Sequence, residues 1–207
     1  MMKKIFLGLI LSLSIFSLAS CNNKKEEIKN DKNDQNEEIK NDNKIDNSLS
    51  IVVYYSATSH TENVAKYISE YTNSNIYELV PKQKYTSADL NYGNSNSRVV
   101  KEHNDLNRHV ELESTTFDGF SEAKYIYIGA PVWWQELSWV IDDFIKDNDF
   151  SGKTIIPFAT SASSSYTTTK LQAYTTDAVW MSPQRFSSNT MKTTVINWID
   201  SLGIYEK

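Results

Sequence analysis

Short apolar runs alternate with longer helical patterns along residues 49–207 of this chain. The runs lie at residues 50–55, 75–80, 124–129 and 153–158, with a weaker one at 177–181. Helical spacing of apolar residues lies between them, at 62–72, 136–148, 166–174 and 190–202. Near-continuous apolar strands are typical of a sheet buried on both faces, and intervening helices favour parallel pairing. The pattern therefore predicts an α/β fold with a doubly wound parallel sheet between two layers of helices.

The first 20 residues carry a different pattern, in which two lysines precede an apolar run that ends at Ala19. This order of charge and apolar residues is typical of a secretory signal peptide, and the run is shorter than the roughly 20 apolar residues of a membrane span. Residues 18–21, Leu-Ala-Ser-Cys, resemble the lipobox of bacterial lipoproteins, in which the cysteine is acylated. We therefore expect Cys21 to carry lipid and to anchor an extracytoplasmic protein at a membrane. An ordinary signal peptide with a chance cysteine is the alternative.

Residues 22–48 hold eight asparagines, eight acidic residues, six lysines and no aromatic residue. Such a segment buries too little apolar surface to offset its chain entropy, so we predict a disordered tether. All five tryptophans and all twelve tyrosines fall in residues 49–207, which are enough for one packed core. The sequence therefore divides into a signal peptide at 1–20, a lipidated cysteine and polar tether at 21–48, and a single α/β domain at 49–207.

Charge and cysteine content exclude several classes of function. Lysine and arginine number 21 against 26 acidic residues, a net charge of -5, so no basic surface favours nucleic acid. Cys21 is the only cysteine, which excludes an internal disulfide and an all-cysteine metal site. The three histidines lack metal-ligand spacing, and no G-x-S-x-G motif supports a serine hydrolase. A redox role would therefore need a bound cofactor.

Three turns follow predicted strands and should meet at the carboxyl edge of the sheet, where such folds bind ligands. The first is Ser56-Ala57-Thr58-Ser59-His60-Thr61, which enters a helix whose N-terminal amides suit a phosphate. The second is Pro131-Val132-Trp133-Trp134, in which we expect one indole to join the core and one to meet a flat ligand. The third is Thr160-Ser161-Ala162, whose small side chains allow close approach. Together they predict one pocket for a planar, phosphorylated molecule.

These turns resemble loops of the flavodoxin family. Residues 56–61 are similar to its phosphate loop, written S/T-x-T-G-N-T, and residues 129–134 to the G-x-P-x-W-W loop of a bacterial subgroup. Residues 150–158 and 85–91, with Arg98 and Glu102, resemble further parts of that subgroup. The resemblance implies a five-stranded sheet in the order 2-1-3-4-5 with FMN as cofactor. It assigns the phosphate to the first turn, and the two sides of the flavin ring to the second and third turns.

Two departures from the family pattern stand at the predicted site. Ser59 and His60 replace the family's Gly-Asn, and residues 159–163 replace its C-T-x-G-G. A serine at positive φ costs roughly 1 kcal/mol or more, and His60 is expected to take over the phosphate contact of the asparagine. The sequence thus favours an FMN-binding electron carrier, or a small flavin oxidoreductase, with an unidentified protein as redox partner. A cofactor-free binding module with the same fold is the alternative.

Overall fold

The computed structural model describes residues 49–162 and 165–205; the predicted signal peptide, Cys21 and tether lie outside the described residues. The strands are β1 (Ser50–Tyr54), β2 (Asn75–Glu78), β3 (Tyr125–Trp133), β4 (Glu136–Leu137), β5 (Thr154–Thr160), β6 (Val179–Trp180) and β7 (Gln184–Phe186). The helices are α1 (His60–Thr72), α2 (Arg98–Asn104), α3 (Asp142–Asp147), α4 (Thr169–Gln172), α5 (Lys192–Ser201) and the 3-10 helix η1 (Trp139–Ile141). Within these ranges no helix has the length and hydrophobicity needed to cross a membrane.

The sheet has the strand order β2-β1-β3-β5-β6, with β4 paired to β3 and β7 paired to β5. All pairs are parallel except β3 with β4, which are antiparallel. The predicted doubly wound order is confirmed for the five main strands, while β4 and β7 are additions that the sequence pattern did not predict.

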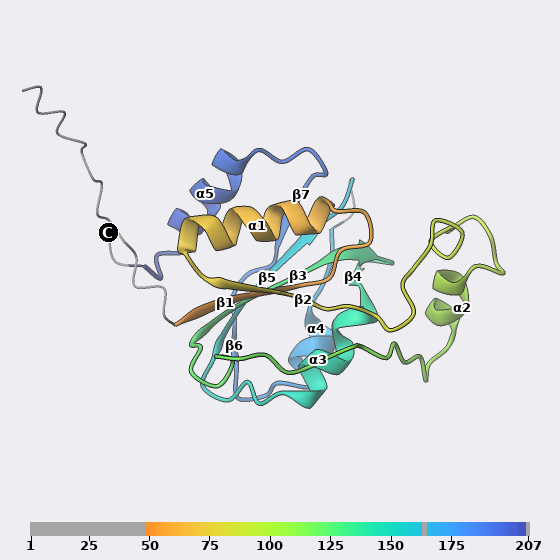
Figure 1. The fold of residues 1–207 in the computed structure, drawn as a ribbon, viewed down its shortest axis with the longest axis horizontal. Helices are drawn as coiled ribbons and strands as arrows, with labels where there is room; N and C mark the ends of the chain where they lie inside the picture. The colour runs from red at the N-terminus through yellow and green to blue at the C-terminus, as the bar shows by residue number, and fades with distance from the viewer. Residues whose placement is uncertain (1–48, 163–164, 206–207) are drawn as a thin grey trace, which may run out of the picture. The chain divides into compact units, whose positions relative to one another are not determined.

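Alternate residues of each strand point to opposite faces of the sheet, and each face packs against its own helices. On one face, Val52 belongs to a core cluster with residues of α1 and α5. On the other face, Ile51 and Val53 belong to a larger cluster with residues of η1, α3 and α4. Figure 1 shows the two helical layers, with α1 and α5 on one side of the sheet and α3 and α4 on the other. Burial of both faces explains the near-continuous apolar runs of β1, β3 and β5.

The segment 136–148 was expected to be one helix, and this expectation is wrong. Its first residues form β4, which pairs with the end of β3 in a hairpin through Trp133 and Glu136. Ser138 then caps η1, since its hydroxyl accepts a hydrogen bond from the backbone N–H of Val140. Regular α-helix begins only at Asp142. β4 and η1 therefore occupy the residues in which the apolar spacing predicts the first turn of the helix.

The carboxyl-terminal third contains less helix than its pattern predicts. The expected helix at 166–174 is reduced to the four residues of α4, and the weak strand at 177–181 to the two residues of β6. β6 pairs with the beginning of β5, and β7 pairs with its end, at Phe158–Thr160. Two short strands therefore share one neighbour, and β7 contributes to the carboxyl edge of the sheet.

Gly129 of β3 lies under an aromatic side chain of β5. It is the register partner of Phe158, whose aromatic ring lies across the glycine. A Cβ atom at position 129 would come within 2.0 Å of that ring. Packing between neighbouring strands thus requires glycine at the first position of the G-x-P-x-W-W motif.

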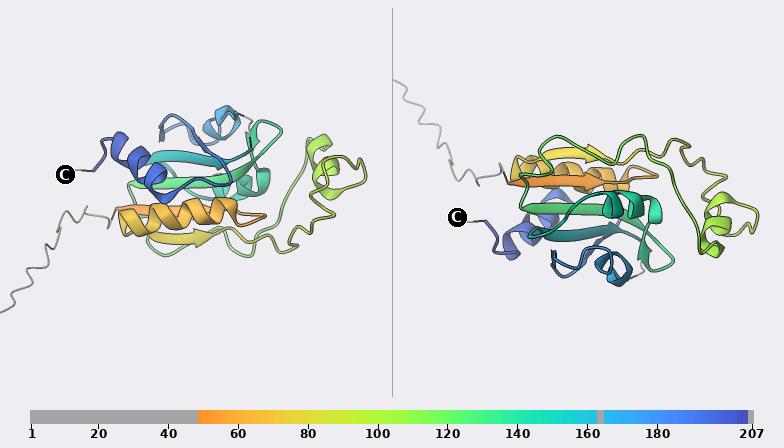
Figure 2. Two further views of the ribbon diagram at one scale, coloured as in Figure 1. Left: turned by 90° about the horizontal axis from the view of Figure 1, so that it is seen from above. Right: turned by 90° about the horizontal axis from the view of Figure 1, so that it is seen from below.

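The chain between β2 and β3 leaves the sheet and carries α2. Pro81 and Leu112 pair at the base of this excursion, and the N–H of Lys82 donates to the carbonyl of Glu111 at 2.9 Å. Figures 1 and 2 show α2, in yellow-green, beyond the ends of the strands at which α1 begins. α2 therefore stands at the carboxyl edge of the sheet.

Candidate functional site

The three predicted turns meet at the carboxyl edge of the sheet. The register pairs Tyr54 with Gly129 and Pro131 with Thr160, so β1, β3 and β5 end beside one another. The buried hydroxyls of Thr61 and Thr160 form a hydrogen bond of 2.7 Å, which joins the first turn directly to the third. The structure thus brings together segments that lie 99 residues apart in the chain.

The first turn presents the open end of α1. Ser59 has φ 60°, in the left-handed region, and Thr58, Ser59 and His60 are exposed. The first helical hydrogen bond runs from the N–H of Asn63 to the carbonyl of Ser59 at 3.0 Å. The amides that precede it point out of the helix end, where the helix dipole favours an anion. This geometry suits the phosphate of a nucleotide.

Two side chains of the first turn differ in how well they would suit a phosphate. Among the described residues, the Oγ of Ser56 is buried without a hydrogen-bond partner. Such a group costs about 1–3 kcal/mol, which a phosphate oxygen would offset. The Ser59 hydroxyl instead bonds the carboxylate of Glu62, whose pKa is lowered by a hydrogen bond from Lys66 and, to a lesser extent, by this bond from Ser59. Ser56 therefore fits a phosphate better than Ser59 does.

A hollow of about 130 Å³ lies beside the first turn, on the side of β2. Ser56 lines it together with Glu78 and Lys84, which come from the end of β2 and the loop that follows. Small-molecule pockets are usually larger than roughly 300 Å³, so the hollow fits one end of a cofactor at most. No residue of the second or third turn lines this hollow, so a ligand that contacts all three turns would extend beyond it.

The two tryptophans of the second turn have different environments, as expected. Trp133 is 2% exposed and packs edge to face against Tyr55, Tyr85 and Trp139, with ring centroids 4.9–5.9 Å apart. Trp134 is 36% exposed, and one face of its ring stacks on His103 at 4.1 Å. Trp133 is therefore a core residue, and Trp134 is the one of the pair that a ligand can reach.

The turn that carries Trp134 is strained. Trp134 and Gln135 have φ 45° and 66°, the backbone of a type I′ hairpin turn, which normally uses asparagine and glycine. Non-glycine residues held there cost on the order of 1–3 kcal/mol each, and such strain often marks a functional site. The N–H of Thr167 donates to the carbonyl of Gln135 at 3.0 Å. This bond fixes the second turn to the segment that follows the third.

The third turn becomes more exposed along its length. Thr160 is buried, Ser161 is half-buried and Ala162 is exposed. The Ser161 carbonyl accepts a hydrogen bond of 2.9 Å from Nη1 of Arg185 on β7. Arg185 adds a positive charge next to the predicted ring site. This residue was not predicted, because nothing in the sequence pattern indicates β7.

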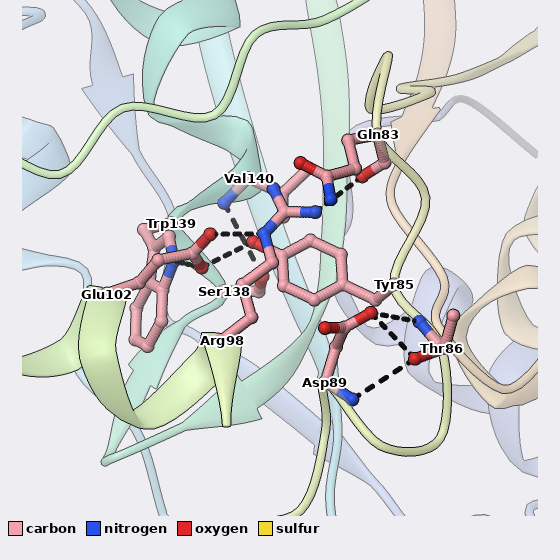
Figure 3. Close-up of polar contacts among 9 residues, drawn as sticks. All are labelled: Gln83, Tyr85, Thr86, Asp89, Arg98, Glu102, Ser138, Trp139 and Val140. Carbon is pink, nitrogen blue, oxygen red and sulfur yellow. Dashed lines mark hydrogen bonds and ion pairs between the residues drawn. The ribbon is translucent and has the colours of Figure 1, made fainter. Parts of the chain in front are cut away.

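A second group that the sequence analysis did not assign to the site lies under α2. Glu102 accepts hydrogen bonds from the Tyr85 hydroxyl at 2.5 Å, the Trp139 indole at 2.8 Å and Nε of Arg98 at 2.6 Å. Figure 3 shows these side chains converging on the carboxylate from three segments of the chain. Burial, with the hydrogen bond to Glu102 as a second cause, raises the pKa of Tyr85 above its usual range. The network holds α2 against η1 and the loop that carries Tyr85.

The histidines of the α2 region take separate roles. His103 stacks on Trp134, while Nδ1 of His109 lies 2.9 Å from a carboxylate oxygen of Asp143. Within residues 49–162 and 165–205, no group of three or more histidine, cysteine or acidic side chains is arranged to hold a metal ion.

Fold and edge together define a class of protein: a doubly wound α/β domain that offers a helix end, an aromatic turn and a hydroxyl turn at one sheet edge. A family model described as flavodoxin matches residues 49–202, and the chain belongs to this family. A solved candidate flavoprotein from Bacteroides uniformis is 37% identical, with a TM-score of 0.68 over 73% of this chain and 97% of that one. Another, from Bacteroides eggerthii, is 30% identical, with a TM-score of 0.67 over 75% and 98%. No curated protein matches the chain.

Proposed function

We propose that this protein binds FMN at the carboxyl edge of the sheet and transfers electrons, as a carrier or as a small flavin oxidoreductase. The observation that carries the proposal is the meeting of the three turns, which the Thr61–Thr160 hydrogen bond and the strand register join at one edge. Bound FMN supplies reversible uptake of electrons, and the protein supplies position and electrostatics. The two Bacteroides relatives, each described as a candidate flavoprotein, support a flavin as the class of ligand.

In this proposal the first turn binds the phosphate. The free amides at the start of α1 donate to it, the Ser56 hydroxyl gains the partner that it lacks, and Thr58 adds a hydroxyl from an exposed position. His60, exposed at the first position of the helix, adds a donor and becomes a cation when protonated.

The second and third turns bind the flavin ring. The partly exposed indole of Trp134 offers a stacking surface, and Pro131 and Val132 are half-buried beside it. Thr160, Ser161 and Ala162 meet the ring from the other side. Because the Thr167–Gln135 hydrogen bond holds the two segments together, the separation of the two walls is set before a ligand arrives.

Titration of the full-length chain with FMN tests the proposal. We expect saturable binding, seen as quenching of tryptophan fluorescence and as a yellow protein with the absorbance band of oxidised flavin. Trp134→Ala should weaken binding by about three- to tenfold, the value of one aromatic stacking contact, without loss of the fold. The control Trp198→Phe alters an indole of α5 that packs on Tyr127 and Phe186 on the α1/α5 face, and it should bind as the parent does. A folded chain that stays colourless and unquenched in excess FMN excludes the proposal.

A cofactor-free binding module remains the second candidate, and one observation favours it. The hydroxyls of Thr61 and Thr160 bond each other, and that of Ser59 bonds Glu62, so three hydroxyls of the predicted site already have partners. In this case neither the parent nor the Thr61→Val variant should bind FMN. In the FMN-binding case, the same change should weaken binding, because it loosens the first turn from the third.

We further propose that acylated Cys21 anchors the protein at a membrane surface outside the cytoplasm, on the basis of the sequence pattern of residues 1–21. Replacing Cys21 by serine should move the protein from the membrane fraction to the soluble fraction and remove labelling by a radioactive fatty acid. Lys25→Ser, which changes the tether alone, is the control and should leave both unchanged. Continued acylation of the Cys21→Ser chain would exclude this anchor.

A further inference from the structure

The aromatic side chains between α2 and the sheet form a connected series that FMN binding does not explain. Trp134 neighbours Trp139 at 5.8 Å, Trp139 neighbours Trp133 at 4.9 Å, and Trp133 neighbours Tyr85 at 5.2 Å between ring centroids. We propose that this series is a one-electron relay, which moves an oxidising equivalent from Trp134 at the surface to Tyr85, with Glu102 as the acceptor of the tyrosine proton. The relay needs no flavin and goes beyond the proposed function.

Differences in burial among the tryptophans of the series determine which of them solvent can reach. Trp134 is the one exposed tryptophan among the described residues, whereas Trp133 and Trp139 are 2% and 3% exposed. Within the series, an oxidant in solution therefore meets Trp134 first. Neighbouring rings at these distances are near van der Waals contact at their edges, so an electron crosses each step without an intervening residue.

The hydrogen bonds of Glu102 make Tyr85 the final electron donor of the relay. Its Oε2 accepts from both the Tyr85 hydroxyl and the Trp139 indole, and its Oε1 accepts from Arg98. The two oxygens thus divide their roles: one faces the oxidisable groups, and the other is held by a cation, as Figure 3 shows. A phenol with a carboxylate at 2.5 Å has a base within reach of its proton.

Arg98 also determines the form that the oxidised tyrosine takes. Its guanidinium carbon lies 3.9 Å from the centroid of the Tyr85 ring. A positive charge over the ring disfavours a radical cation there, since like charges repel in a partly buried site. Tyr85 must therefore lose its proton together with its electron, and Glu102 is the base that receives it.

The step balances in electrons and protons. A radical oxidant takes one electron from Trp134 and is itself reduced. Trp139 and Trp133 each pass one electron outward, and Tyr85 supplies the last one while its O–H bond breaks and the proton moves to Oε2 of Glu102. The products are restored tryptophans, a neutral tyrosyl radical and a protonated Glu102. The transfer is downhill at neutral pH, because a neutral tyrosyl radical is less oxidising than a tryptophanyl radical.

Pulse radiolysis with the azidyl radical, which oxidises exposed indoles, tests the relay without any cofactor. The full-length chain is used with the Cys21→Ser change, which removes its single cysteine and the proposed lipid. We expect the tryptophanyl absorbance to decay in a first-order phase, independent of protein concentration, while tyrosyl absorbance grows at the same rate. Tyr85→Phe should abolish that growth. Glu102→Gln, which keeps the size of the side chain but removes the base, should slow it at least tenfold.

The controls separate a relay from simple packing. Trp198→Phe lies outside the series and should leave the rate unchanged, whereas Trp139→Phe, which interrupts the series, should slow it. Tyr92 is the competing acceptor, because its ring lies 5.0 Å from that of Trp134. Loss of the tyrosyl growth in Tyr92→Phe, with normal growth in Tyr85→Phe, would overturn the proposal. If Tyr85→Phe does not fold, the other two variants decide. Unchanged rates of tyrosyl growth in both Glu102→Gln and Trp139→Phe would also overturn the proposal.

Discussion

Ser59 has a backbone conformation that its side chain does not favour. Its φ of 60° lies in the left-handed region, and its side chain makes no cap hydrogen bond to the start of α1. The hydroxyl bonds Glu62 instead, which places a carboxylate near the end of the helix that the proposed phosphate would approach. Lys66 pairs with Glu62 at 2.5 Å, so this charge is largely compensated. Ser59 thus carries strain that no contact of its own relieves.

Replacing Ser59 by glycine should therefore stabilise the protein. Glycine adopts positive φ without steric cost, and the gain exceeds the added entropy of the unfolded chain, leaving a net of about 0.5–1 kcal/mol. For a domain of this size, we expect the midpoint of thermal unfolding to rise by about 1–4 °C, measured by circular dichroism. FMN should bind more tightly to this variant than to the parent.

Ser87→Gly is the matched control, because Ser87 is exposed and is absent from the positive-φ residues. Glycine there adds unfolded-state entropy with no strain to relieve, so its midpoint should stay the same or fall. A fall in the midpoint of Ser59→Gly would show that the turn is not strained.

Among the secondary-structure elements, β5 is fixed at its beginning by a buried lysine. Lys153 is 8% exposed, and its ammonium donates to the carbonyls of Phe120, Ser121 and Ala123 at 2.8–3.0 Å. These carbonyls belong to the loop that enters β3, so one side chain ties the starts of two neighbouring strands. Burial lowers the pKa of Lys153, while Asp149 opposes this effect.

Lys153→Met should destabilise the domain by about 2–4 kcal/mol, because it removes charge-assisted hydrogen bonds and leaves carbonyls without partners. Urea unfolding followed by fluorescence measures the change. Lys84→Met is the control: Lys84 is exposed, and removal of its charge should change the free energy of unfolding by no more than about 0.5 kcal/mol. Equal effects of the two changes would contradict the role assigned to Lys153.

The sequence predicts best those elements whose residues are decided locally. β1, β3, β5 and α1 follow from apolar runs and helical spacing, and the observed bounds differ from the expected ones by a few residues. The hairpin at Trp134 and Gln135 was missed because neither residue is a usual choice for a turn with two positive φ values. β7 was missed because three residues gain a strand only by pairing with β5.

The same distinction applies to the site. Its three turns could be predicted because they follow strands and carry unusual local composition, and the partition of the tryptophan pair into core and surface was also expected. Arg185 and Glu102 could not be assigned, since each depends on a hydrogen bond to a residue 17 or more positions away. Side-chain networks that span distant segments leave no periodic signal in the sequence.

Across the whole molecule, many tyrosines are buried with raised pKa values. For Tyr54, burial is the largest cause and raises the pKa to about 12. Four others have pKa values raised still further: Tyr55, Tyr85, Tyr127 and Tyr166. In the unfolded chain a tyrosine ionises near pH 10. Between these values the folded protein holds protons that the unfolded chain has released.

The protein should therefore lose stability in alkali. The contribution of these tyrosines is fully present below about pH 10 and declines as the pH rises toward and through about 12, by up to about 1.4 kcal/mol per pH unit for each group. Urea unfolding at a series of pH values measures the slope. Tyr127→Phe should make the free energy of unfolding fall less steeply with pH. Tyr174→Phe is the control, because that side chain is 47% exposed, and it should leave the slope unchanged. A slope of zero above pH 10 would contradict the assignment.

The close approach of Phe158 to Gly129 gives the first residue of the G-x-P-x-W-W motif a structural role. An alanine there would have its methyl group inside an aromatic ring, whether or not any dye is held nearby. A protein of this fold that binds no flavin would still need glycine at this position for β3 and β5 to pack. The glycine of this motif is therefore required by strand packing and does not by itself indicate a bound flavin.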